Sequence, residues 1–153
     1  MITTDIDEKW MRAAIEAARS ARDLGEVPVG ACLVDLGGNL LSIASNRAIT
    51  LHDPSAHAEM LALREAAAKV ENYRLTGVTA YSTFEPCVMC AGALVNARVA
   101  RLVFGVHNSR RGAVESKFNI CNYELLNHRI EIVPGVLADE CRALICEFYR
   151  APR

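Results

Sequence analysis

Hydrophobic side chains recur at helical spacing in the first stretch of the chain, from Ile6 to Leu24. This spacing predicts an amphipathic helix that is closed by Gly25. The segments VPVGACLVD and NLLSIASN come next, separated by LGG, and they indicate two strands joined by a tight glycine turn. The chain is therefore expected to begin with one helix and a β-hairpin.

The rest of the chain alternates between helical and strand patterns. A helix start signal, DPS, precedes the alanine-rich segment AHAEMLALREAAAKV, which predicts a helix. GVTAYST alternates as a strand does, CVMCAGALVNA predicts a buried helix, and RLVFGV predicts a strand. We expect a loop with a short helix over 107–128 and a brief strand at RIEIVPG. The apolar stripe of a C-terminal helix is then expected at Cys141, Leu144, Ile145 and Phe148.

This order of elements predicts an α/β fold in three layers, α/β/α, with a mixed five-stranded sheet covered by helices. The length of 153 residues suits one domain, which we expect to span residues 1–153. With 52% hydrophobic and 23% charged residues, the chain has the composition of an ordered protein.

Composition also bears on location. No apolar run approaches the roughly 20 residues that a membrane helix needs, and the acidic start MITTDIDEKW argues against a secretory signal. Six cysteines in a chain of this size indicate reduced thiols rather than a disulfide framework. We therefore expect a cytoplasmic protein without a membrane partner.

The net charge of −1 gives no sign of a nucleic-acid binder, but the charges are unevenly distributed. Residues 1–97 carry 8 basic and 12 acidic side chains, whereas residues 98–153 carry 9 basic and 6 acidic ones. Two interpretations stay open: ordinary surface variation, or a local basic region that binds phosphates.

The chemistry is concentrated in two short motifs. Cys87 and Cys90 follow Pro86 at a spacing that brings both thiols to one side of a helical first turn, where the helix dipole favours thiolates. His57 can supply a third zinc ligand, and Glu59 is close enough to handle a proton without binding the metal. Three ligands leave one position for water, so the pattern predicts one catalytic Zn²⁺ per chain.

The competing hypothesis is a structural zinc site, which needs a fourth protein ligand. Each motif alone is weak, but their combination is the H-x-E…P-C-x-x-C signature of zinc nucleobase deaminases. The residues that could fill the fourth position are Cys32, Cys121, Cys141, Cys146, His52, His107 and His128. Cys32 lies in a predicted strand, and Cys141 and Cys146 fit the core of a helix.

Nearly the whole chain resembles the tRNA-specific adenosine deaminase family. The resemblance is carried by EVPVGA, SNRAITLHDPSAHAEMLALREA, NYRLTG, EPCVMCAGALVNARVARLVFG and LNHRIEIVPGVLADECRAL. It implies a cytidine deaminase-like fold, a homodimer, and conversion of adenosine to inosine at the wobble position of a tRNA anticodon loop. It also implies that His57, Cys87 and Cys90 bind zinc and that Glu59 moves protons.

A set of substrate contacts is also expected, some of them implied by this resemblance and others by the departure from the family described next. These are Asn46, Glu26, Val27, Pro28, Val29, Ala58, Pro86, Asn108, Ser109, Arg111, Tyr149 and Arg150. Asn46 would hydrogen-bond a flipped nucleotide, and the segment 26–29 would wall its pocket. Simpler explanations stay open: a turn role for Asn46, core packing for Val29, and helix packing for Tyr149.

The chain departs from the family after RLVFG, where it reads VHNSRRG. Asn108 stands where the family has an aspartate, and Arg111 adds a charge. Together these resemble replacements in laboratory-evolved adenine base-editor deaminases that act on DNA. Further positions with this resemblance are Ala48, Leu51, Phe84, Asn119, Asn122, Tyr123, Cys146, Tyr149 and Pro152.

The departure predicts deamination of deoxyadenosine in single-stranded DNA, with an engineered origin and a programmable DNA-binding fusion partner as corollaries. An asparagine removes a charge that repels phosphate and lessens dependence on a ribose 2′-hydroxyl, and an arginine adds a phosphate contact. Two alternatives remain: a cytosine deaminase acting on single-stranded DNA, and a non-catalytic zinc-binding module. A free guanine deaminase is less favoured because of Asn46 and the NHR…ADEC tail.

Overall fold

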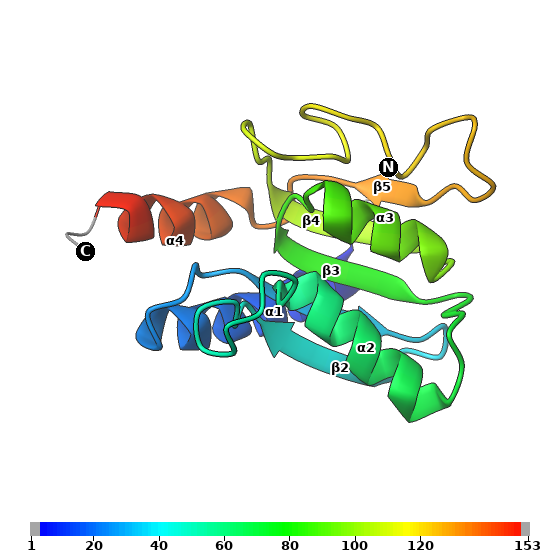
Figure 1. The fold of residues 1–153 in the computed structure, drawn as a ribbon, viewed down its shortest axis with the longest axis horizontal. Coiled ribbons are helices and arrows are strands. Elements are labelled where there is room, and N and C mark those ends of the chain that lie inside the picture. Colours follow the sequence, from blue (N-terminus) through cyan, green and yellow to red (C-terminus); the bar gives the residue numbers. More distant parts are fainter. Residues whose placement is uncertain (1–3, 151–153) are drawn as a thin grey trace.

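A five-stranded sheet runs through the middle of the molecule (Figure 1). The computed structural model describes residues 4–150, so Pro152 lies outside the described residues. The strands are β1 (Gly30–Val34), β2 (Leu40–Ser45), β3 (Thr79–Phe84), β4 (Arg101–Val106) and β5 (Glu131–Val133). They are ordered β2-β1-β3-β4-β5; β1 is antiparallel to both of its neighbours, whereas β3, β4 and β5 are parallel.

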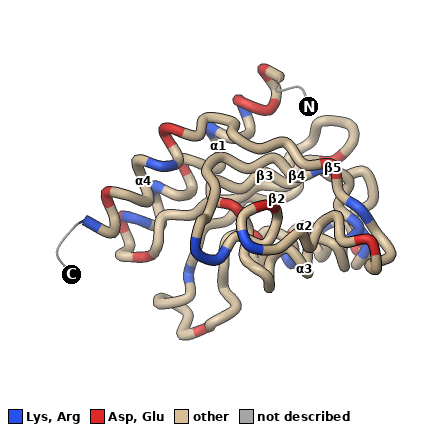
Figure 2. Tube along the Cα trace, turned by 90° about the horizontal axis from the view of Figure 1, so that it is seen from above, with Lys and Arg blue, Asp and Glu red and all other residues tan. Residues whose placement is uncertain are grey.

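Two helices cover each face of this sheet. The helices α1 (Asp5–Asp23) and α4 (Ala138–Arg150) pack on one face. The helices α2 (Ala58–Val70) and α3 (Val88–Asn96) lie on the other, as the view along the sheet shows (Figure 2). The expected three-layer α/β/α arrangement with a mixed five-stranded sheet is confirmed.

Alternation along the strands divides the core into two halves. Leu33 and Phe104 point toward α2 and α3, whereas their strand neighbours Cys32 and Val103 point toward α1 and α4. All four are buried, because a sheet covered on both faces has no side exposed to water. This burial explains why β1 and β4 are almost continuously apolar in sequence.

Gly30 allows α1 to approach the sheet closely. A Cβ at this position would overlap the backbone of Ala14 and Ala18 in α1, so a larger residue would push the helix away. The small residues on both sides let backbone meet backbone.

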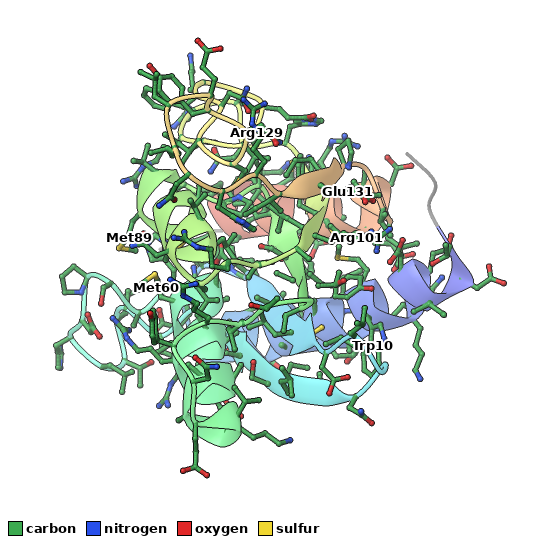
Figure 3. All side chains as sticks on the ribbon, turned by 90° about the vertical axis from the view of Figure 1, so that its right-hand side faces the viewer. Trp10, Met60, Met89, Arg101, Arg129 and Glu131 are labelled. Carbon is green, nitrogen blue, oxygen red and sulfur yellow. The ribbon has the colours of Figure 1, made fainter. Side chains whose placement is uncertain are left out.

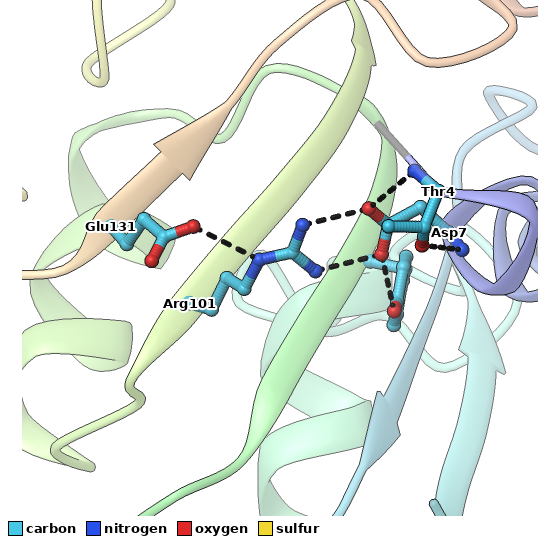
Figure 4. A network of polar contacts seen from close by, with 5 residues as sticks. Thr4, Asp7, Arg101 and Glu131 are labelled. Carbon is cyan, nitrogen blue, oxygen red and sulfur yellow. Dashed lines mark hydrogen bonds and ion pairs between the residues drawn. The ribbon is translucent and has the colours of Figure 1, made fainter. Parts of the chain in front are cut away.

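A buried ion pair fixes the start of α1 to the sheet (Figure 4). Asp7 is 1% exposed and receives two hydrogen bonds of 2.7 Å from the Arg101 guanidinium, and one of 2.8 Å from the Tyr81 hydroxyl. Thr4 caps the helix and exchanges hydrogen bonds with Asp7. Burial alone would raise the pKa of Asp7, but the hydrogen bonds from Arg101 and Tyr81 hold it below its ordinary value.

The segment 107–128 differs from the sequence-based expectation. It forms a run of turns without the predicted short helix, and it passes above α3 and β5 (Figure 1). Several of its backbone N–H groups donate to the side chain of Glu85 instead of to carbonyls one helical turn earlier. The Glu85 carboxylate, which is distant in the sequence, thus accepts hydrogen bonds that nearby carbonyl groups would accept in a helix.

We predict that Arg101→Met lowers the free energy of unfolding by about 3 kcal/mol, because it leaves the Asp7 carboxylate buried without its cation. The folded-state pKa of Asp7 lies below its unfolded value, so the ion pair stabilises above the unfolded pKa and is lost as pH falls through the folded one. The difference between wild type and variant should thus be largest at neutral pH and shrink below about pH 4.

Urea unfolding measured across pH tests this prediction. Arg19→Met is the matched control, since Arg19 pairs with Glu16 on the exposed surface of α1 and should cost at most about 0.5 kcal/mol. Equal losses in the two variants would contradict a special role for the buried pair.

Candidate active site

Three potential metal ligands meet where α2 and α3 begin. His57 is the N-cap residue of α2, Cys87 is the N-cap residue of α3, and Cys90 lies in the first turn of α3. The chain enters α3 directly from the carboxyl end of β3 through Glu85 and Pro86. The packing of α2 beside α3 then brings residues 30 positions apart to one point.

The distances within this cluster match those of a zinc site. The Nδ1 atom of His57 lies 3.6 Å from the Sγ of Cys87 and 3.5 Å from the Sγ of Cys90. Tetrahedral zinc with ordinary Zn–S and Zn–N bonds would place a sulfur and a nitrogen about 3.5 Å apart. All three ligand atoms lie within 4.8 Å of one another. The donor set therefore fits Zn²⁺ without rearrangement.

The local electrostatics provide a thiolate. A hydrogen bond from Cys90, and then contact with His57, lower the pKa of the Cys87 thiol to about 3. The position of Cys87 at the start of α3 adds the positive end of the helix dipole. A deprotonated sulfur is the form that binds a metal, so this ligand is ready at neutral pH.

Glu59 lies in the first turn of α2, directly beside the cluster. It is 6% exposed, and burial raises the pKa of its carboxyl to about 7. It also interacts with Cys90, which places it in the immediate surroundings of the metal ligands. A carboxyl with a pKa near neutrality can both accept and release a proton.

Within the described residues, the cluster contains three ligands, and none of the seven alternative cysteines and histidines joins it. Cys32, Cys121 and Cys141 are buried elsewhere, and burial raises the pKa of each thiol to about 12. Cys146 corrects an expectation, because it is half-buried and faces a cavity instead of the helix core. The structural-zinc hypothesis thus lacks a fourth ligand in the described chain.

A cavity of about 810 Å³ opens above the cluster, a volume in the usual range for ligand sites. His57, Cys87 and Glu59 lie in its wall. The predicted substrate-contact residues that line it are Val27, Val29, Asn46, Asn108, Ser109, Arg111, Tyr149 and Arg150. The fold thus gathers residues from several segments that are distant in sequence around one space.

Four predicted contact residues do not line this cavity: Glu26, Pro28, Ala58 and Pro86. Glu26 is 1% exposed, and its carboxylate accepts hydrogen bonds from the backbone N–H of Ile49 at 3.2 Å and of Thr50 at 2.6 Å. The position of Glu26 is that of an anchor for the loop after β2. Pro86 accepts a hydrogen bond from the backbone N–H of Ala113, at 2.8 Å.

Asn46 connects the end of β2 to the start of α2. Its Oδ1 accepts a hydrogen bond of 2.8 Å from the backbone N–H of Ala58, and its own N–H donates to Val29 at 3.1 Å. With Oδ1 occupied, the amide N–H donors of Asn46 are the part of the side chain available to a ligand. Its orientation is set by the helix next to the metal cluster.

Sequence reasoning missed several lining residues: Phe84, Glu85, Val106, His107, Arg110, Arg142, Ile145 and Cys146. Those on α4 could have been found from spacing. Arg142, Ile145 and Cys146 precede Tyr149 and Arg150 by one or two helical turns and so share their face. Glu85 gave no periodic signal, because its role depends on a loop far along the chain.

The open rim of the cavity is basic. Arg110, Arg111, Arg142 and Arg150 line it and are all exposed, while its acidic members Glu59 and Glu85 are buried. Figure 2 shows basic positions along α4 toward its free end. This arrangement favours a ligand that carries negative charge outside and an uncharged group inside.

Comparison with known proteins also supports a zinc-dependent deaminase. Residues 4–106 match the family model described as the cytidine and deoxycytidylate deaminase zinc-binding region. A tRNA-specific adenosine deaminase of Haemophilus influenzae is 45% identical over 152 residues, covering 99% of this chain and 88% of that protein. One from Bacillus subtilis is 42% identical over 147 residues, covering 96% and 91%.

Solved structures agree. A structure from a study of A-to-I editing by tRNA:A34 deaminases at the wobble position of transfer RNA superposes with a TM-score of 0.85 at 37% identity, covering 89% of this chain and 98% of that one. Guanine deaminase from Nitrosomonas europaea gives 0.80 at 26% identity, covering 99% and 87%. The matched family is a zinc-binding one, and His57, Cys87 and Cys90 are arranged as zinc ligands would be. In addition, no helix of the described residues has the length and apolarity needed to cross a membrane.

We predict that Cys87→Ser abolishes stoichiometric zinc, because a hydroxyl does not deprotonate at neutral pH as this thiol does. Metal analysis of purified protein should give one zinc per wild-type chain and well under half in the variant. Cys32→Ala, a change at a buried cysteine outside the cluster, should keep its zinc. Equal zinc in all three proteins would contradict the assigned ligands.

Proposed function

The chain belongs to the tRNA-specific adenosine deaminase family, and we propose that it hydrolyses the exocyclic amine of adenosine in nucleic acid, yielding inosine and ammonia. The observation that carries this proposal is the buried carboxyl of Glu59 beside a three-ligand zinc site in the wall of a cavity with a basic rim. Such a cavity can take an unstacked base inside and the phosphates at its mouth.

The chemistry divides between the metal and the side chains. Zinc held by this ligand set supplies the Lewis acidity that makes water nucleophilic at neutral pH. Glu59 accepts a proton as water adds to C6 of adenine and delivers it to the departing amine, so that one water is consumed and one ammonia released. Asn46 orients the nucleotide through its amide donors, and Val27 and Val29 pack against it.

We predict that Glu59→Gln lowers turnover of an adenosine-containing RNA stem-loop by about 10²- to 10⁴-fold, because the amide cannot carry the proton. Zinc content and RNA affinity should stay within twofold of wild type. Mass spectrometry of digested RNA, which separates inosine from adenosine, provides the measurement.

The same variant separates the zinc-module alternative from an enzyme. A non-catalytic module would make no inosine in wild type and lose nothing in Glu59→Gln. The cytosine-acting alternative is separated by matched strands that contain either one adenosine or one cytidine. Conversion of cytidine alone would overturn the assignment of adenine as the target base.

We propose that deoxyadenosine in single-stranded DNA is also a substrate, alongside tRNA. Support comes from the neutral Asn108, which lies on the cavity wall, and from the exposed Arg111 three residues on. The Oδ1 of Asn108 accepts a hydrogen bond of 3.1 Å from the backbone N–H of Arg111, so the two are positioned together. A phosphate contact from Arg111 does not need a 2′-hydroxyl, and the neutral Asn108 does not repel the phosphates of either kind of strand.

Asn108→Asp should reduce deamination of single-stranded DNA by about tenfold and deamination of RNA by less, because it returns a negative charge to the cavity rim. Initial rates on matched DNA and RNA strands at fixed salt provide the test. Asn127→Asp is the control, since it adds the same charge at an exposed residue that does not line the cavity. An unchanged DNA-to-RNA ratio in Asn108→Asp would refute this part.

We also propose a homodimer in the cytoplasm. Apolar side chains that single domains usually bury are exposed on α3 and in the 107–128 segment after β4: Val88, Phe118, Tyr123, Leu125 and Leu126. The half-buried Met60 of α2 and Met89 of α3 lie close together in the view of Figure 3, on two helices that are in contact. An engineered origin and a fusion partner stay predictions that rest on sequence resemblance.

A further inference from the structure

Glu85 is a buried carboxylate that the proposed reaction does not use. It is 1% exposed and lies between the end of β3 and Cys87, and its backbone N–H donates to Val106 at the end of β4, at 2.9 Å. It forms part of the cavity wall, yet its side chain is turned to the loop that follows β4. A charged group in such a place needs partners to offset its desolvation.

All the partners of this carboxylate come from one loop, residues 107–116. Its Oε1 accepts from the backbone N–H of Asn108 at 3.0 Å and from the hydroxyl of Ser116. Its Oε2 accepts from the backbone N–H groups of Val114, Glu115 and Ser116 at 3.1, 2.8 and 2.9 Å. Five donors from both ends of the loop thus converge on one side chain.

The loop is shaped around this acceptor. Gly112 leaves room for it, because a Cβ there would overlap the Glu85 carboxylate. Three further hydrogen bonds close the loop: Gly112 to the Asn108 carbonyl at 2.8 Å, Lys117 to the Gly112 carbonyl at 2.9 Å, and Ala113 to the Pro86 carbonyl at 2.8 Å. The last of these ties the loop to the residue that precedes Cys87.

The same loop holds the residues that face the ligand. Asn108, Ser109 and Arg111 line the cavity, as do His107 and Arg110. Asn108, Ser109 and Arg111 lie in no strand or helix, because the loop consists of turns. Their positions relative to the zinc site therefore depend on what fixes the loop.

We propose that Glu85 is a positioning residue for substrate binding: its carboxylate holds the 107–116 loop in the conformation that presents its side chains to the nucleic acid. Because Glu85 directly precedes Pro86 and Cys87, one short turn places a zinc ligand and anchors the substrate-facing loop. The inference rests on the proposed function only for its kinetic part, since the anchoring can be measured without turnover.

Glu85→Gln tests this proposal. The amide of glutamine has only one oxygen, and its NH₂ group would face N–H groups of the loop that need an acceptor. Amide hydrogen exchange of residues 108–116 should accelerate by roughly tenfold or more, while exchange in α3 and zinc content stay as in wild type. The KM for the nucleic-acid strand should rise by about tenfold, with kcat within about threefold, because binding rather than proton transfer is weakened.

Two further variants complete the design. Gly112→Ala disturbs the same contact from the loop side and should reproduce the rise in KM; if Glu85→Gln does not fold, this variant carries the test. Asp7→Asn is the matched control, a buried carboxylate that also accepts several hydrogen bonds but lies outside the cavity wall. It should lower stability without changing exchange in 108–116 or the KM.

The outcomes are distinct. Unchanged loop exchange and unchanged KM in both Glu85→Gln and Gly112→Ala would overturn the proposal. It would also be overturned if exchange in Glu85→Gln became faster evenly over the whole sheet, which is the pattern that we expect for Asp7→Asn. A wild-type protein that deaminates neither RNA nor DNA would refute the proposed function instead. The exchange contrast between Glu85→Gln and Asp7→Asn would then still decide the anchoring.

Discussion

The site depends on the convergence of two helix N-termini on one face of the sheet. His57 starts α2 and Cys87 starts α3, and the packing of these helices on the same sheet face sets the sulfur and nitrogen atoms at zinc-ligand distances. Helix starts also carry unpaired N–H groups and a positive dipole end, which stabilise a thiolate and orient neighbouring acceptors. One of these N–H groups, that of Ala58, donates a hydrogen bond to the Oδ1 of Asn46 and so orients this side chain.

Three buried carboxylates organise the surroundings of this centre in two different ways. Glu59 has few compensating partners, so burial raises its pKa to about 7 and suits it to proton transfer. Glu26 accepts two backbone hydrogen bonds and Glu85 accepts four, and each carboxylate holds a loop. The number of hydrogen-bond donors around a buried glutamate, rather than its burial, thus decides whether it can transfer protons or anchors a loop.

The basic residues around the cavity come from two separate parts of the fold. Its arginines are exposed and come from the 107–116 loop and from α4, two segments whose positions relative to the zinc site are set separately. The loop is tied to the turn that bears Cys87, whereas α4 packs on the opposite face of the sheet through Cys141 and Leu144. A nucleic-acid strand that follows this rim would contact both.

The sequence by itself determined the periodic elements and the layered α/β class, and it predicted the set of candidate zinc ligands that the fold brings together. Apolar periodicity is local, and so are the two motifs that carry the chemistry: His57 and Glu59 are two positions apart, and Cys87 and Cys90 are about one helical turn apart. The tertiary structure alone decided where Glu26 and Glu85 act, that Cys146 faces the cavity, and that 107–128 forms no helix. The reason is physical: the two glutamates act through hydrogen bonds between residues 23 to 31 positions apart, and the cavity wall combines residues from distant segments, which no local pattern contains.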